Sequence, residues 1–143
     1  MNINWKPTYI PGDLVYNHKG EVIRITSSYL KGTRLFYYKT DEIGGSIGCI
    51  LEEALKPIPL TPEILEKNGW KLLKHHKRNS YDDVSWSSYH KPAETNISLI
   101  FYQEEKAFFP FLYAQEISEA PIRYIHQLQH LLFGLGLNSE MEV

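Results

Sequence analysis

The stretch PIPLTPEILEKNGW (residues 57–70) constrains the fold more than any other part of this sequence. Its first two prolines hold the backbone extended. Thr61 then stands at the N-cap position of a helix and Pro62 at the first helical position, where a missing N–H costs nothing. Asn68 and Gly69 supply the left-handed stop that ends a helix. The segment therefore predicts one short helix, with both ends specified, between two β regions.

Residues 1–56 carry a β pattern punctuated by glycine-rich turns. Gly12 marks a turn before the first run, and Gly20 occupies the hairpin position that favours a positive φ. Short β-branched or aromatic runs at this spacing predict an SH3-like β subdomain, either a small barrel or a strongly bent sheet. One helical turn at residues 51–55 is expected to close it. The runs are Leu14–Tyr16, Val22–Thr26, Arg34–Lys39 and Ser46–Ile50.

After a Pro-rich joint at residues 57–61, residues 62–143 predict an α+β subdomain with a short helix, about four antiparallel strands and a C-terminal helix at about 121–135. The leucines of that last helix fall on one side with Ile125, so we expect it to pack within this second half. Pro110 predicts an edge or a bulge in its strand. The expected fold class is thus α+β and β-rich. The predicted strands are Trp70–Lys74, Val84–His90, Ile97–Tyr102 and Ala107–Tyr113.

Composition limits the classes of function. The chain has 143 residues with 15 Lys and Arg against 17 Asp and Glu, and its net charge of −2 lacks the basic excess of a dedicated duplex-DNA binder. No apolar run reaches ~18 residues, so we expect no membrane span. The single cysteine, Cys49, has no internal disulfide partner, and residues 1–10 show no secretory leader. We therefore expect a cytoplasmic protein with a buried structural thiol.

A dense basic segment follows the predicted short helix and has an aromatic residue on each side. Cations beside aromatic rings suit the phosphates and bases of a single strand or a nucleotide. The alternative is a solvated loop between two strands, in which the acidic pair Asp82-Asp83 offsets part of the charge. The segment comprises Lys71, Lys74, His75, His76, Lys77 and Arg78, with Trp70 before it and Tyr81 after it.

Aromatic residues make up 13% of the chain and concentrate in the predicted strands. Alternation places Trp70 and Leu72 on one face of their strand, and Trp86 and Tyr89 on opposite faces of the next. A sheet covered by helices on one face leaves aromatic side chains on the other, as a protein or nucleotide contact surface. The same side chains would equally serve as an interface between the two halves of the chain.

His126 and His130 stand four residues apart on the terminal helix, a spacing that can present two imidazoles to one zinc ion. The sequence indicates no third ligand, and Gln127 stands where a metalloprotease helix would have a glutamate. The alternative is that His126 hydrogen-bonds a neighbouring strand or the first subdomain while His130 is solvated. A complete and oriented ligand shell is what a metal site requires, so this pair is only a weak metal candidate.

Several segments together resemble a known group of proteins. The group consists of short uncharacterised proteins found in Bacteroides-type phages, prophages and conjugative elements. The resemblance implies a small cytoplasmic accessory protein of a mobile element that acts on host defence or on element replication, with no established activity or ligand. The chain departs from the pattern at His130, where Asn is usual, and at Gly134 and Gly136. The segments that carry the resemblance are residues 57–70, Gly12-Asp-Leu-Val-Tyr16, Ile97-Ser-Leu-Ile100 and RYIHQLQHLLF at 123–133.

From these observations we expect a non-enzymatic binding protein that grips a host or phage protein in counter-defence, as a monomer or a homodimer. The alternative is a binder of nucleic acid or of a signalling nucleotide through the basic and aromatic loop at residues 70–81. A hydrolase with a metal on His126 and His130 comes third, since no catalytic motif is found and no cofactor is indicated. The residues expected to contact the partner are Lys74, His75, His76, Lys77, Arg78, Tyr81, Trp86 and Tyr89.

Overall fold

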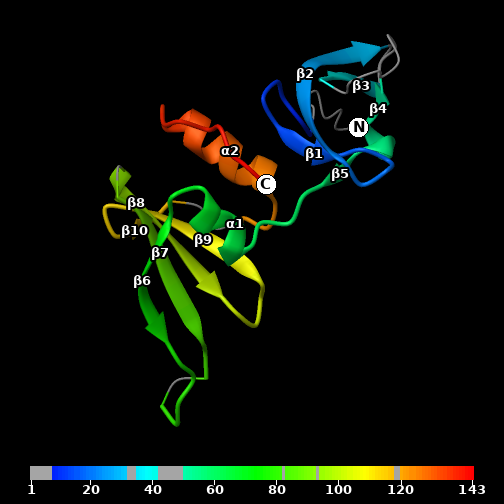
Figure 1. Cartoon of the computed structure of the whole chain (residues 1–143). Coiled ribbons are helices and arrows are strands. Elements are labelled where there is room, and N and C mark those ends of the chain that lie inside the picture. The colour runs from blue at the N-terminus through cyan, green and yellow to red at the C-terminus, as the bar shows by residue number, and fades with distance from the viewer. Residues whose placement is uncertain (1–7, 32–34, 42–49, 82, 93, 118–119) are drawn as a thin grey trace, which may run out of the picture. The chain divides into compact units, whose positions relative to one another are not determined.

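The computed structural model describes residues 8–31, 35–41, 50–81, 83–92, 94–117 and 120–143 (Figure 1). They form two five-stranded antiparallel sheets and two α-helices, which confirms the predicted β-rich α+β class. The chain divides into two units, Met1–Ile58 with Tyr124–Met141 and Pro59–Arg123 with Glu142–Val143. In the described part, neither helix has the length and apolar character needed to cross a membrane.

The sheet of the first unit has the order β4-β3-β2-β1-β5, so its last strand returns to pair with its first. Within the described residues this sheet is open, with β4 and β5 at its edges, and the predicted SH3-like closure is not part of it. A single 3-10 turn, η1 (Glu52–Ala54), precedes β5. Cys49 lies outside the described residues. The strands are β1 (Leu14–Tyr16), β2 (Val22–Lys31), β3 (Leu35–Thr40), β4 (Ile50–Leu51) and β5 (Lys56–Pro57).

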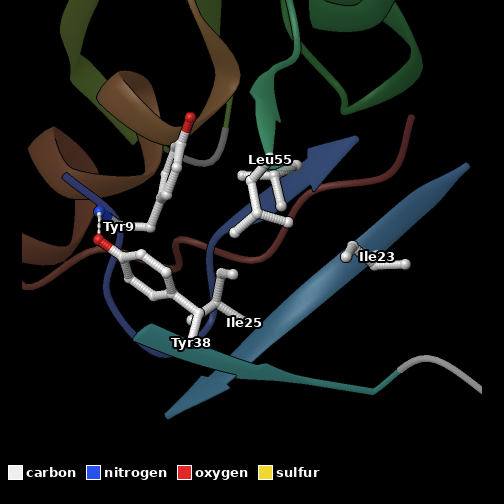
Figure 2. Packing of buried hydrophobic residues seen from close by; sticks show 6 residues of the cluster. Tyr9, Ile23, Ile25, Tyr38 and Leu55 are labelled. Carbon is white, nitrogen blue, oxygen red and sulfur yellow. Dashed lines mark hydrogen bonds between the residues drawn. The ribbon is translucent and has the colours of Figure 1, made fainter. Parts of the chain in front are cut away.

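The core of the first unit gathers alternate side chains of β2 around two tyrosines (Figure 2). Ile23 and Ile25 are buried while Arg24 between them is half-buried, as the two-residue period of a strand requires. Tyr9 and Tyr38 meet edge to face with ring centroids 5.6 Å apart. The backbone N–H of Tyr9 donates to the Tyr38 hydroxyl at 3.4 Å. The Tyr38 hydroxyl also donates to Glu52 Oε1 at 2.6 Å, so it keeps hydrogen-bond partners at the edge of an otherwise apolar cluster.

Helix α2 (Ile125–Gly134) belongs to the first unit. The sequence pattern predicted instead that it packs within the second subdomain, residues 62–143. The predicted apolar face is real, because Ile125, Leu128 and Leu132 are buried. Periodicity identifies a buried face without naming the surface that it meets. The helix also begins later than predicted, since Tyr124 is still extended with φ −127°.

The short helix predicted from residues 57–70 is confirmed as α1 (Pro62–Lys67). The Thr61 hydroxyl accepts a hydrogen bond from the backbone N–H of Ile64 at 3.3 Å, which is the predicted N-cap. Gly69 has φ +87°, so the chain leaves the helix through the left-handed conformation that glycine favours. Leu65 is fully buried. Local signals specify this helix because both of its ends are set by neighbouring residues.

The second unit contains a five-stranded antiparallel sheet in the order β10-β9-β8-β7-β6. The sequence predicts about four of these strands, and the structure adds β10 as a two-residue edge. The tip of the β6–β7 hairpin extends past the ends of the other strands (Figure 1). The strands are β6 (Lys71–His76), β7 (Trp86–Lys91), β8 (Glu94–Tyr102), β9 (Ala107–Leu112) and β10 (Gln115–Glu116).

Pro110 lies in β9, where it was expected to mark an edge or a bulge. Among the described residues, β10 pairs with Phe111 and Leu112, and a separate bridge on that side of β9 joins Phe108 to Ile122. Pro110 falls between these two pairings. Its missing N–H therefore removes no ladder hydrogen bond between described residues, which is how a proline is tolerated within a strand.

Candidate functional site

The register of the second sheet assigns its side chains to two faces. Tyr89 lies opposite Leu99, and Leu99 lies opposite Pro110, so these side chains share one face. All three are buried, as are Ile97 and Phe108 on the same face. This is the face that the second unit uses for its core.

The opposite side of the sheet, the open face, carries the neighbouring residues of each strand. Most of its side chains are half-buried or exposed. It contains four aromatic rings, and the described residues place cations at its β6 edge and a carboxylate at its β10 edge. The open face consists of Lys71, Lys74, His76, Trp86, Ser88, His90, Ser98, Ile100, Tyr102, Phe109, Phe111 and Glu116.

Cross-strand pairing arranges the open face in rows that run from β6 towards β10. Each row begins with a lysine or a histidine and passes an aromatic or aliphatic side chain on β7, β8 or β9. The surface therefore changes from basic to aromatic to acidic across the sheet. The rows are His76-Trp86-Tyr102, then Lys74-Ser88-Ile100-Phe109, then Lys71-His90-Ser98-Phe111-Glu116.

Trp86 is the centre of the basic side of the open face. The His76 ring stacks on it with centroids 5.4 Å apart and an interplanar angle of 21°. The Lys74 ammonium lies 5.7 Å from the centroid of the Trp86 ring, within cation–π range. Sequence reasoning named all three as candidate contacts, and the strand register brings them together. These contacts limit the number of rotamers that the cluster must lose when a partner binds.

The remaining predicted residues of the basic segment occupy different environments. Strand β6 continues through His76, so His75 is in a strand rather than in the predicted loop, and its Nδ1 lies 2.8 Å from Ser87 Oγ on the other face. Lys77 and Tyr81 are exposed at the hairpin tip. Arg78 is exposed there too, with its guanidinium 3.6 Å from the Asp83 carboxylate. Only part of the basic segment therefore belongs to the open face.

Tyr89 was expected at the partner-binding surface, and it is 5% exposed in the structure. Burial raises its pKa, and the carboxylates of Glu66 and Glu63 add to the effect. Its ring packs edge to face against Phe108, with centroids 6.3 Å apart. Alternation correctly put Tyr89 opposite to Trp86, but it did not say which of the two faces is covered. Tyr89 is a core residue.

Strand β6 presents apolar side chains that the sequence did not predict to be exposed. Trp70 and Leu72 were expected on one face, yet Trp70 is buried just before the strand whereas Leu72 is 50% exposed. Leu73 is 64% exposed, and the register shifts between Leu72 and Lys74. Trp70 precedes the strand and so is not part of its alternation. Leu72 lies opposite the buried Tyr89, but β6 is an edge strand and the core covers Leu72 only in part.

The two helix histidines of the metal hypothesis do lie close, with ring centroids 5.6 Å apart. His130 Nε2 is 2.6 Å from Asp13 Oδ2, whereas solvation was the alternative expected for it. His126 is buried, its Nδ1 has no hydrogen-bond partner among the described residues, and burial lowers its pKa. No group of three His, Cys, Asp or Glu side chains that could hold a metal is found among those residues. The pair helps to anchor a helix.

Gln129, which sequence reasoning passed over, completes that anchor. Its Oε1 accepts from the Leu14 N–H at 3.0 Å, and its Nε2 donates to the carbonyl oxygens of Gly12 at 3.0 Å and Ser139 at 3.2 Å. We call Asp13, Gln129 and His130 the clasp. The clasp thus joins Gly12, Asp13 and Leu14 to α2. No local sequence pattern marks this pairing, because the partners are more than a hundred positions apart.

The open face and the clasp therefore differ in what they offer chemically. The polar groups of Asp13 and Gln129 hydrogen-bond the chain's own backbone, and both side chains are buried. The open face presents aromatic rings, cations and hydroxyls at the surface, which is suited to holding a partner. No protein-family model, curated protein or solved structure matches the chain.

Proposed function

We propose that the chain is a binding protein that holds a protein partner on the open face of its second sheet. The observation that carries this proposal is that four partly exposed rings share the open face, namely Trp86, Tyr102, Phe109 and Phe111. Aromatic side chains are enriched in protein interfaces because they bury a large area for a small loss of rotamer freedom. Tyr102 and Phe109 already contact each other edge to face, with ring centroids 5.3 Å apart.

Charge favours a protein over a polyanion as the partner. The open face is basic at Lys71 and Lys74 but acidic at Glu116, and the whole chain has a net charge of −2. A surface with both signs matches a protein surface of complementary pattern. A nucleic acid would place phosphates against the acidic edge.

The second candidate function is binding of single-stranded nucleic acid or a nucleotide at the basic side alone. Lys74 and His76 around Trp86, with Lys77 and Arg78 beyond them, support it. Such binding combines stacking with phosphate contacts and weakens steeply as salt rises. An oligothymidylate titration at low salt separates the two functions, because protein binding predicts no tight complex there.

The setting of the proposal comes from the family resemblance. A small cytoplasmic accessory protein of a phage or mobile element, active in counter-defence, needs a surface for a host protein rather than a catalytic centre. We also propose an SH3-like arrangement for the first unit. Its support is the order β4-β3-β2-β1-β5 with a 3-10 turn before the last strand.

Site-specific photocrosslinking tests the proposed function without disturbing the core. A benzophenone amino acid at Phe111, on the open face, should capture a single dominant protein from host lysate. The matched control carries the same group at Phe133, an aromatic residue of α2 that is 68% exposed. Equal capture from both positions, or none from Phe111, would contradict the open face as the binding surface.

A further inference from the structure

The edges of the two sheets differ in length in a way that bears on what the second unit binds. Three of the edge strands in the described chain, β4, β5 and β10, have only two residues each. Strand β6, the fourth edge, has six residues. Short edge strands prevent pairing with other chains, and a long one permits it. Strand β6 is thus the edge on which another strand has room to pair.

The side chains of β6 are also exposed on both faces of the strand. Every residue from Lys71 to His75 is exposed, including Leu72 and Leu73. Within the described residues β6 pairs only with β7. An added strand would therefore gain main-chain hydrogen bonds along β6 and would cover two leucines that now face water.

The charge along this edge selects the kind of strand that can be added. Residues 71–81 contain Lys71, Lys74, Lys77 and Arg78 and no acidic residue. Two copies of β6 paired with each other would place lysines near lysines, which is unfavourable. The lysines of this edge thus disfavour pairing between two copies of β6 and favour an acidic segment.

We propose that β6 is a docking edge that takes an extended acidic segment of a partner protein as an additional antiparallel or parallel strand. The proposal rests on the proposed function only in making the partner a protein. The added strand would direct carboxylates towards Lys71 and Lys74 and apolar side chains towards Leu72 and Leu73. Main-chain pairing supplies affinity, and the alternating side chains supply specificity.

A defined peptide tests the docking edge on the full chain. The probe is a capped eight-residue peptide of alternating glutamate and valine, compared with the same peptide carrying N-methyl groups on alternate amides. N-methylation removes backbone donors and keeps every charge. We expect the unmodified peptide to slow amide exchange in β6, and N-methylation to weaken binding by about tenfold, the loss expected from one or two hydrogen bonds.

Charge reversal supplies the second measurement. Lys74→Glu should weaken the peptide by about fivefold, the effect of one cross-strand charge pair. Lys56→Glu is the matched control, since Lys56 is also an exposed lysine on an edge strand, β5, of the first unit. The control should bind the peptide like the unmodified protein.

Four results would overturn the proposal, and the last also separates it from the proposed function. Equal binding of the N-methylated peptide would mean charge attraction without strand pairing. Protection of first-unit amides instead of β6 would place the peptide elsewhere. Displacement of a weakly held peptide by oligothymidylate, with tighter binding of the oligonucleotide, would assign the edge to nucleic acid. If the peptide does not bind while the Phe111 variant still crosslinks one protein, the docking edge is wrong and the proposed function stands. If the peptide does not bind and the Phe111 variant crosslinks no protein, the proposed function is wrong too.

Discussion

The two units of this chain use polar side chains in opposite ways. In the first unit the buried Asp13 and Gln129 are consumed by hydrogen bonds to their own backbone. In the second, Lys71 and Lys74 are turned to water beside exposed leucines. Buried polar groups are costly unless satisfied, so the clasp is explained by folding. The exposed edge contributes little to folding, which makes it the better candidate for binding.

This contrast predicts that clasp substitutions reduce stability, while edge substitutions reduce binding and leave stability almost unchanged. The largest effect should come from Gln129→Leu, which keeps the size of the side chain. It removes three hydrogen bonds and leaves the Leu14 N–H and the Gly12 carbonyl without their partner. At about 1 kcal/mol for each bond, the free energy of unfolding should fall by about 3 kcal/mol.

Urea unfolding combined with hydrogen exchange at the Leu14 and Val15 amides measures the Gln129 effect and assigns it to the first unit. Gln103→Leu, in an exposed turn of the second unit, is the matched control and should change the free energy by less than about 0.5 kcal/mol. Similar values for both variants would mean that the clasp does not hold α2.

A pH dependence should come next, from His126. Burial lowers its pKa, the His130 charge adds to this, and the Asp13 carboxylate opposes it. Tyr9 and Tyr124 also face its ring. An unfolded histidine has a pKa of about 6.5, so between that value and the lower folded pKa the unfolded chain binds more protons. The free energy of unfolding should therefore fall as the pH drops below about 6.5, by at most ~1.4 kcal/mol per pH unit for this one proton.

Replacing the titrating ring tests this sign. His126→Phe should flatten the pH profile of unfolding between pH 7 and pH 5, whereas His18→Phe, at an exposed hairpin position, should leave the slope unchanged. Parallel profiles for the unmodified protein and His126→Phe would show that the buried imidazole does not titrate in that range.

A smaller effect is expected in the second unit from Thr61→Ala. This change removes the hydroxyl that accepts the Ile64 N–H, and the loss of an N-cap costs about 1 kcal/mol. Thr61→Ser keeps the acceptor and should retain most of the stability. Exchange of the Leu65 amide, which is bonded to the Thr61 carbonyl at 3.1 Å, reports on α1 directly. Equal exchange rates in both variants would mean that the Thr61 hydroxyl does not stabilise α1.

The two units also differ in how far their sequences predicted them. Helix α1 is predictable because Thr61, Pro62 and Gly69 specify its ends within a few residues. The burial of Tyr89 was not predictable, because alternation separates the two faces of a strand without saying which face is covered. Helix α2 was placed in the wrong half for a related reason. Its partner is set by Gln129 and His130, which bond to residues more than a hundred positions away.

The exposure of β6 was missed because the prediction treated Trp70 and Leu72 as one covered face of a strand. Trp70 precedes β6, and Leu72 lies on an edge strand that the core covers only in part. The basic residues around it were identified from composition alone. Their value as a site depends on β6 lying at an edge, which only the sheet order reveals.

The smallest change in stability should follow from Leu73→Ser, and it tests the contrast from its other side. Leu73 is 64% exposed at the bulge, so its removal from water contributes little to folding, and the free energy of unfolding should change by less than about 0.5 kcal/mol. Binding of the glutamate–valine peptide should nevertheless weaken, because the added strand loses an apolar contact. Urea unfolding and peptide titration of the same sample compare the two. A loss of stability above about 1 kcal/mol would mean that Leu73 packs against the fold, and β6 would then be a structural edge like β4, β5 and β10.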